Sequence, residues 1–268
     1  MKYKIIATDM DDTLLNSSHE ISEENIQSII EVQEKGVKFV LASGRPTFAM
    51  HSFANELDMK RLGGYILGYN GGEIIDVSTG DIIFEKALTR DVIEVIYNES
   101  KSNELSFLTY SDDTIYGDEW NEYTTEEVTL TGMKWKEINS FDELPIEKSI
   151  KCMILGEPKK LTAVQKKLQE KYKQDYVINI SKPIFLEFTK KGINKGESLK
   201  RLCDMLGIST EEMICVGDSF NDMTMLEVAG LPVAVENARE EIKAISKFIT
   251  TSNDNHALKT LIFKYFRD

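Results

Sequence analysis

The apolar and polar positions divide the chain into two stretches with an alternating strand and helix pattern and a middle stretch of different texture. Residues 4–7 are a short apolar run that predicts a strand, and apolar residues at helical spacing after Ser22 predict a helix that ends at Gly36. Residues 37–42 predict the next strand. Two strands joined by a helix form a βαβ unit, which implies a parallel sheet.

The same pattern continues after the second strand and returns near the carboxyl terminus. A helix is expected after Pro46, and a short strand is expected at residues 64–67, directly before Asn70-Gly71-Gly72. The later elements are predicted at 195–206 (helix), 213–216 (strand), 222–229 (helix) and 231–235 (strand). Both ends of the chain are therefore expected to build one α/β core.

The middle of the chain is richer in aromatic and acidic residues and holds both tryptophans. It contains a helical pattern between two strands near residues 152–155 and 176–180. We interpret residues 84–188 as an inserted α+β domain, and residues 1–83 and 189–268 as a discontinuous α/β core.

Length and composition are compatible with this two-domain interpretation. A chain of 268 residues is near the size at which single cores stop growing. A hydrophobic content of 41% and a charged content of 29% describe a soluble globular protein, and no apolar run approaches the roughly 20 residues that cross a bilayer. Acids interrupt the amino-terminal apolar run, so we expect no signal peptide and a cytoplasmic location.

Charge, cysteines and histidines exclude several classes of function. A net charge of −13 argues against nucleic-acid binding, because phosphate backbones are held by clustered Lys and Arg, and no membrane partner is expected. Cys152, Cys203 and Cys215 show no CxxC spacing and lie in apolar stretches, so we expect them in the core. The three histidines show no HExxH spacing, which argues against zinc hydrolysis.

The most informative chemistry follows the first predicted strand, where Asp9 and Asp11 stand two positions apart. Ligands of α/β sheets bind at the carboxyl ends of the strands, so both carboxylates would enter such a crevice. One can attack while the other carries a proton, which points to covalent phosphoryl transfer. Aspartate also favours turns and helix caps, so this stretch alone leaves both interpretations open.

Small and amide residues follow the next two predicted strands. Ser43 and Gly44 can donate hydrogen bonds to a phosphoryl oxygen, and the glycines after Asn70 would let the backbone approach a ligand closely. Each of these motifs alone is also compatible with an ordinary turn.

Two further motifs lie in the carboxyl-terminal part of the chain. Lys195 stands at the start of a predicted helix, where its charge and the helix terminus would attract phosphate. The strand at 213–216 leads into Gly217-Asp218-Ser219-Phe220-Asn221-Asp222, whose carboxylates are hard oxygen ligands that suit Mg²⁺. A surface lysine and helix capping by Asp218 or Asn221 are the competing interpretations.

In this order, the motifs DxDxT, Ser-Gly-Arg, Lys and GDxxxD resemble the haloacid dehalogenase superfamily of phosphotransferases. The insert after the third core strand and the sequences SGRP, NGG and NKG resemble the Cof-type phosphatases, whose lid is a type IIB cap. The resemblance implies a Rossmann-like parallel-sheet core with an inserted α+β cap. Asp12 departs from the pattern, since many members carry glycine there, and we expect no catalytic role for it.

The resemblance also implies the catalytic roles. Asp9 would be the nucleophile that forms an aspartyl-phosphate, and Asp11 would protonate the departing alkoxide and then accept a proton from water. Ser43 and Lys195 would hold the non-bridging oxygens of the phosphate. The remaining expected contacts of the phosphate or substrate are Thr13, which would steady the loop, Gly44, Arg45, Asn70, Gly71 and Asn221.

Mg²⁺ is the cofactor that the resemblance implies. It would be held by the Asp9 carboxylate, the main-chain carbonyl of Asp11 and Asp218, with Asp222 either ligating or orienting a bound water. Its role would be templating and charge neutralisation, because an anionic nucleophile must approach an anionic phosphate.

The expected function is therefore hydrolysis of a small phosphorylated metabolite, such as a sugar phosphate, by a monomer or homodimer whose cap selects the substrate. Tyr110, Tyr116 and Lys182 of the insert could contact it, although core packing or solvent exposure explains each of them equally well. A phosphomutase on the same scaffold and a catalytically idle phosphometabolite sensor stay open as alternatives. A response-regulator receiver fits less well, since it needs far fewer residues and no cap.

Overall fold

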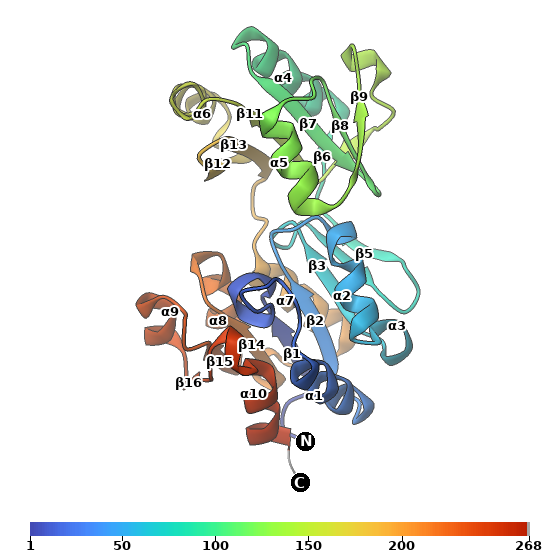
Figure 1. Ribbon diagram of the computed structural model, residues 1–268, viewed down its shortest axis with the longest axis vertical. Helices are drawn as coiled ribbons and strands as arrows, with labels where there is room; N and C mark the ends of the chain where they lie inside the picture. The colour runs from blue at the N-terminus through green and yellow to red at the C-terminus, as the bar shows by residue number, and fades with distance from the viewer. Residues whose placement is uncertain (267–268) are drawn as a thin grey trace. The chain divides into compact units, whose positions relative to one another are not determined.

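The computed structural model describes residues 1–266 and divides into two compact units (Figure 1). The first unit comprises Met1–Phe84 and the chain from Asn194 onward, and the second unit comprises Glu85–Ile193. The boundaries expected from the sequence were 83/84 and 188/189. The second of these is too early, because a strand of the second unit continues through Lys190.

The first unit is built on an eight-stranded sheet in the order β16-β15-β14-β1-β2-β3-β4-β5. Neighbouring strands from β16 to β3 are parallel, whereas β3 and β4 are antiparallel. The strands are β1 (Ile5–Thr8), β2 (Lys38–Ala42), β3 (Tyr65–Gly68), β4 (Glu73–Asp76), β5 (Ile82–Glu85), β14 (Met213–Gly217), β15 (Leu231–Ala234) and β16 (Phe248–Ile249).

The helices of the first unit are α1 (Glu23–Glu34), α2 (His51–Glu56), α3 (Met59–Leu62), α7 (Lys195–Leu206), α8 (Met223–Val228), α9 (Glu240–Ile245) and α10 (Ala257–Phe266). Local signals set their ends. The Ser22 hydroxyl accepts a hydrogen bond from the backbone of Asn25 at the start of α1, and the Asn194 amide oxygen accepts one from Glu197 at the start of α7. The predicted strands and helices of the α/β pattern are thus confirmed, within one to three residues at their ends.

Two features near the third strand differ from the sequence interpretation. Asn70-Gly71-Gly72 forms the turn of the β3–β4 hairpin, and β5 follows before the chain enters the second unit. The insert therefore follows the fifth strand of the chain and not the third. A hairpin that only adds strands to an existing sheet does not follow the alternating strand and helix pattern. That pattern therefore could not reveal β4 and β5.

The position of the candidate site follows from this sheet. The parallel strands are almost entirely buried and apolar, as expected for a sheet covered on both faces. Since β1, β2 and β14 are parallel neighbours, their carboxyl ends meet at one edge of the sheet. Asp9, Ser43 and Asp218 directly follow these three strands.

The second unit is a six-stranded sheet in the order β12-β13-β11-β7-β8-β9, with a separate small pair, β6 and β10. The strands are β6 (Leu88–Thr89), β7 (Ser106–Ser111), β8 (Thr114–Gly117), β9 (Lys134–Glu137), β10 (Lys148–Ser149), β11 (Lys151–Leu155), β12 (Tyr176–Lys182) and β13 (Phe185–Lys190). Three helices accompany them: α4 (Arg90–Ser102), α5 (Glu122–Thr131) and α6 (Pro158–Tyr172).

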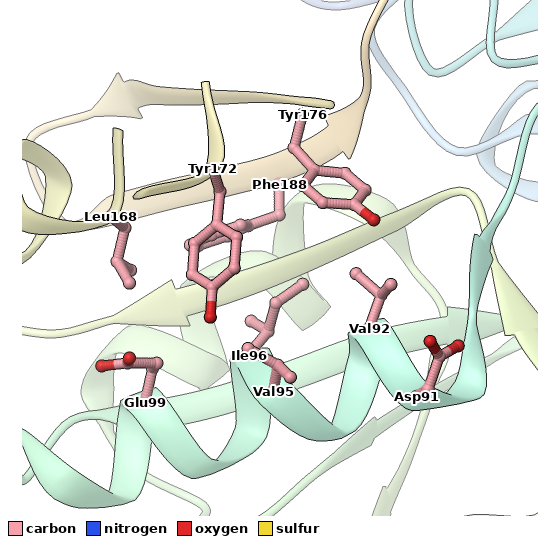
Figure 2. A pocket seen from close by; sticks show the side chains of 9 residues that line it. All are labelled: Asp91, Val92, Val95, Ile96, Glu99, Leu168, Tyr172, Tyr176 and Phe188. Carbon is pink, nitrogen blue, oxygen red and sulfur yellow. The ribbon is translucent and has the colours of Figure 1, made fainter. Parts of the chain in front are cut away.

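The apolar core of the second unit lies between its sheet and the helices α4 and α6. A hollow of about 90 Å³ opens between these two helices, and its side chains are drawn in Figure 2. Its lining includes Val95, Tyr172 and Tyr176, and none of the site residues predicted from the sequence. In residues 1–266, no helix combines the length and the apolar character that crossing a membrane requires.

Candidate active site

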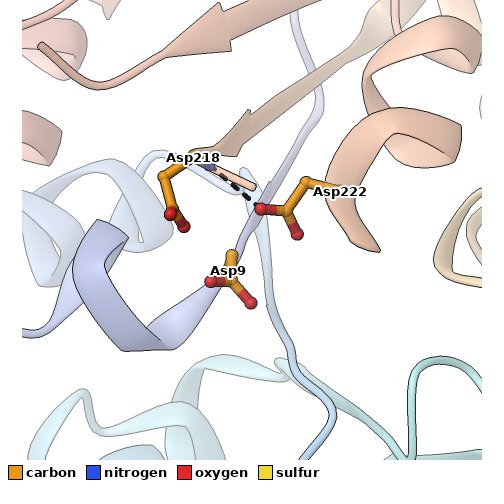
Figure 3. Close-up of side chains that lie close together, drawn as sticks. All are labelled: Asp9, Asp218 and Asp222. Atoms are coloured by element: carbon orange, nitrogen blue, oxygen red, sulfur yellow. Dashed lines mark hydrogen bonds between the residues drawn. The ribbon is translucent and has the colours of Figure 1, made fainter. Parts of the chain in front are cut away.

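Three carboxylates meet at the carboxyl edge of the first unit's sheet (Figure 3). Asp9 follows β1, Asp218 follows β14, and Asp222 ends the short helical turn Phe220–Asp222. One carboxylate oxygen of each lies within 4.8 Å of those of the other two. The topology brings them together because β1 and β14 are adjacent parallel strands.

Lys195, the first residue of α7, is the cation of this cluster. Its Nζ atom donates to Asp9 Oδ1 at 2.5 Å and to Asp222 Oδ1 at 2.6 Å, and the side chain is fully buried. Burial lowers the pKa of Lys195, but the two carboxylates outweigh this effect, so the pKa is raised and the ammonium stays charged.

The carboxylates outnumber this single ammonium. Burial, together with repulsion from Asp222 and Asp218, raises the pKa of Asp9 well above its ordinary value, although Lys195 opposes the shift. Burial and the negative charge of Asp222 raise the pKa of Asp218 to about 6. The cluster therefore favours an additional cation.

Asp222 is the carboxylate most fully engaged by the protein. Its Oδ2 atom accepts hydrogen bonds from the backbone of Asp218 at 3.0 Å and Ser219 at 3.1 Å, while Oδ1 accepts from Lys195. The side chain is fully buried. These contacts fix the loop that presents Asp218. Both carboxylate oxygens of Asp222 are thus already engaged in hydrogen bonds within the protein.

The loop after Asp9 is a tight turn at Met10–Leu14 that reaches back to the cluster. The Thr13 hydroxyl donates to Asp218 Oδ1 at 2.9 Å. Asp12 has a φ of 57°, in the left-handed region where glycine is favoured. This conformation gives a physical reason for glycine at the same position in the pattern that the sequence resembles. Aspartate tolerates the conformation better than most residues do.

A second hydrogen-bonded set joins the ends of β2 and β3. Arg45 donates to both oxygens of Asp11, from Nε at 3.0 Å and from Nη2 at 2.6 Å. The Ser43 hydroxyl accepts the backbone N–H of Arg45 at 3.2 Å, and the Ser43 carbonyl accepts the backbone N–H of Asn70 at 2.8 Å. Arg45, expected to contact phosphate, thus pairs with the expected general acid.

The remaining predicted residues hold different positions. A Cβ atom on Gly44 would lie 3.2 Å from the Asn70 amide nitrogen, so these two residues are in contact. The amide oxygen of Asn70 is buried and lacks a hydrogen-bond partner within residues 1–266. Gly71 has a φ of 100° and its carbonyl accepts from Ser198 of α7. Asn221 is exposed and belongs to neither hydrogen-bonded set among the described residues.

The donor set of the acidic cluster fits Mg²⁺. It consists of carboxylate oxygens, which are hard ligands, and it carries more negative charge than Lys195 compensates. Asp9 and Asp218 would hold the ion, and Asp222 would orient the loop. A bound Mg²⁺ would neutralise negative charge at this edge of the sheet.

A parallel α/β sheet with acids, a lysine and a serine at one edge defines a phosphoryl-transfer class of protein. The family model for haloacid dehalogenase-like hydrolases matches residues 6–262, and the chain belongs to this family. A haloacid dehalogenase-like hydrolase of Bacteroides thetaiotaomicron has a crystal structure that is similar with a TM-score of 0.95. Its identity is 38%, and the match covers 98% of this chain and 100% of that one.

Relatives with named activities are similar over almost the whole chain. Phosphatase YwpJ of Bacillus subtilis is 30% identical, with 95% of this chain and 97% of the relative covered. The 5-amino-6-(5-phospho-D-ribitylamino)uracil phosphatase YcsE of the same organism is 30% identical, with 93% and 90% covered. The chain is a hydrolase of the phosphatase group, as the sequence predicted.

The sequence interpretation missed several polar residues. Asn237 donates to the Asp12 carbonyl at 2.8 Å, and the backbone of Arg239 donates to the Asp218 carbonyl at 3.0 Å, so a distant loop supports both acidic loops. In the second unit, Lys151 is buried beside Glu187. A lysine within an otherwise apolar strand was the available signal for this pair.

Proposed function

We propose that this protein is a Mg²⁺-dependent phosphatase that hydrolyses small phosphorylated metabolites through an aspartyl-phosphate on Asp9. The observation that carries the proposal is the position of Asp9. It lies buried at the carboxyl end of β1, 2.5 Å from Lys195 Nζ, with two further carboxylates close by. A carboxylate fixed by one ammonium is oriented to attack a phosphoryl group that binds at the same edge.

In the first step, an Asp9 oxygen forms a bond to phosphorus while the bond to the leaving oxygen breaks. Asp11 gives its proton to that leaving oxygen. Water then attacks phosphorus, gives a proton to Asp11, and releases phosphate as the Asp9 carboxylate reforms. Ser43 and Lys195 would hold the non-bridging oxygens in both steps. Mg²⁺, when bound, would offset the repulsion between the carboxylate and the phosphate.

The Arg45–Asp11 pair adds a requirement to this scheme. Asp11 accepts two hydrogen bonds from the guanidinium, one at each carboxylate oxygen, so both oxygens are engaged in this arrangement. Arg45 must therefore release an oxygen of Asp11 before that carboxyl can contact the leaving oxygen of a substrate. An arriving phosphate supplies an alternative partner for the guanidinium, so substrate binding would itself free Asp11.

Phosphorylated sugars and polyols are the proposed substrate class. The named activity of YcsE involves a phosphorylated ribityl chain. The second unit, Glu85–Ile193, would be the cap that selects the leaving group.

The test is phosphate release from a panel of sugar and polyol phosphates, with and without Mg²⁺, by wild type and Asp9→Asn. We expect release that requires Mg²⁺ and falls by more than about 10³-fold in Asp9→Asn, because the amide is a poor nucleophile. Asp204→Asn, an exposed aspartate of α7, is the matched control. Thermal unfolding with and without Mg²⁺ reports metal binding independently of turnover. Normal turnover by a folded Asp9→Asn protein would rule out the covalent mechanism.

A further inference from the structure

The hollow between α4 and α6 of the second unit involves none of the groups of the acidic cluster. Its volume is about 90 Å³, less than the roughly 150 Å³ of a cavity that holds benzene, so it suits one compact organic group. The rings of Tyr172 and Tyr176 lie on one side of it and α4 lies on the other (Figure 2). All of its lining residues belong to the second unit.

The walls of this hollow are apolar and aromatic. Ile96 and Phe188 are buried, whereas Val95 is 38% exposed and both tyrosines are half-buried. The centres of the two tyrosine rings are 6.4 Å apart, and the rings are inclined at 63°. Water therefore reaches part of the apolar wall, and a ligand that covers this part gains free energy.

Carboxylates stand at both ends of the α4 segment that lines the hollow (Figure 2). Glu99 pairs with Lys167 at 3.0 Å, so its charge is compensated. Asp91 accepts a hydrogen bond from the Thr89 hydroxyl and forms no ion pair within residues 1–266. That hydrogen bond lowers the pKa of Asp91, so the carboxylate is ionised near neutral pH. The Asp91 end of the hollow thus carries an uncompensated negative charge.

The charge and the aromatic rings together favour a cation. Aromatic rings attract cations over their faces, and Lys171 Nζ already lies 4.8 Å from the centre of the Tyr172 ring. Tyr176 and Asp91 are therefore the groups left to hold the charge of a ligand. An anion would be repelled by Asp91, and a metal ion would find few oxygen ligands among apolar walls.

We propose that this hollow binds a small organic ammonium ion, with its charge beside Asp91 and the Tyr176 ring and its apolar groups against Val95 and Tyr172. A methylated ammonium fits better than a bare one, because its methyl groups cover the apolar wall and it gives up less hydration. The site is complete within the second unit and is independent of the proposed phosphatase function.

The experiment titrates isotope-labelled protein with choline and, separately, with the neutral analogue in which a carbon atom replaces the choline nitrogen. The backbone amide NMR signals of residues 91–96 report binding. Since the two probes have nearly the same shape, the difference between their Kd values measures the effect of the charge. We expect choline to shift these signals with a millimolar Kd and the analogue to bind about 3- to 30-fold more weakly, the range of cation–π attraction at partly exposed rings.

Two variants locate the ligand within the hollow. Asp91→Asn and Tyr176→Leu are each expected to weaken choline binding by about 3-fold or more. Asp91→Asn should leave the weaker binding of the neutral analogue unchanged, because it removes a charge and keeps the shape. Glu94→Gln, an exposed glutamate of α4 that does not line the hollow, is the matched control and should bind choline as wild type does.

Equal affinity of wild type for the two probes would identify the hollow as an ordinary apolar depression and overturn the proposal. The absence of any choline-dependent shift would overturn it as well. Unaltered choline binding by folded Asp91→Asn and Tyr176→Leu proteins would show that choline binds elsewhere. The comparison of the two probes uses wild type alone, so it decides the question even if a variant does not fold.

Discussion

At the scale of single residues, Asp11 differs from Asp9 in how much the protein constrains it. Asp9 is buried and held by Lys195, whereas 45% of the Asp11 side chain is exposed and its partner is Arg45. A nucleophile needs one fixed direction of attack. A general acid must reach the leaving oxygen of the substrate, and a partly exposed carboxylate suits that requirement.

Asp11→Asn tests this division of roles. The amide cannot supply a proton, so turnover of an alkyl phosphate should fall by about 10²- to 10⁴-fold. The loss should be smaller for p-nitrophenyl phosphate, because p-nitrophenolate leaves without much help from an acid. Steady-state rates on both substrates provide the measurement. Equal losses on the two would show that Asp11 orients the site and does not act as the acid.

The same residues show what the sequence could predict of the site. Asp9, Asp218 and Asp222 could be predicted because a strand precedes each acidic motif and parallel strands bring their carboxyl ends to one edge. The pairing of Arg45 with Asp11 could not, because it joins two loops 34 positions apart. No local sequence pattern indicates which acidic side chain a given arginine will pair with.

At the scale of elements, whether a helix or strand could be predicted from the sequence depends on the type of contact that it makes. The bounds of α7 were predicted at Lys195 and Leu206, since Asn194 caps its start and Gly207, with a φ of 64°, ends it. Helix α5 has caps of the same kind, Asn121 at its start and Gly132, with a φ of 66°, after its end, but it lacks an apolar stripe. Of its residues, Thr124 and Glu127 are buried, and it contributes none to the apolar core of the second unit.

Helix α5 instead attaches to the sheet through polar contacts. Besides the bond from Tyr110 to Glu127, Lys182 of β12 pairs with Glu126 at 3.0 Å. Hydrophobic periodicity detects only helices that bury an apolar stripe, so a helix held by hydrogen bonds escapes it. The same attachment makes the stability of this region depend on pH.

Glu127→Gln is expected to change that pH dependence. Burial raises the pKa of Glu127, although Lys151 and the Tyr110 hydroxyl oppose the shift; Glu187 adds to it and Lys182 opposes it weakly. A carboxyl with a raised pKa binds its proton more tightly in the folded chain than in the unfolded chain. The free energy of unfolding therefore falls as pH rises from about 4.5, the ordinary value, through the raised value.

Removing the carboxyl should flatten this part of the curve. Urea unfolding of wild type and Glu127→Gln at several pH values between 4.5 and 8 gives the difference directly, and subtracting the two curves removes the contribution of the active-site acids. If the difference in the free energy of unfolding does not vary with pH, Glu127 has the same pKa in the folded and the unfolded chain.

At the scale of the whole molecule, residues 1–266 form two separate apolar cores, one in each unit. The first unit's core includes Cys203 and Cys215, and the smaller core of the second unit includes Cys152. The three thiols are free and buried, as the sequence predicted. Burial raises the pKa of Cys152 to about 12 and that of Cys203 to about 11, so neither is a reactive thiolate near neutral pH.

These thiols can report the unfolding of each unit separately. A smaller core buries a smaller share of its chain's surface, so the second unit should unfold at a lower urea concentration than the first. Brief alkylation across a urea series, followed by peptide mass spectrometry, should label Cys152 before Cys203 and Cys215, with no labelling of any thiol in the absence of urea. Simultaneous labelling of all three would show that the two units unfold as one cooperative body. In that case, substitutions that destabilise the apolar core of the second unit would lower the stability of the acidic cluster as well.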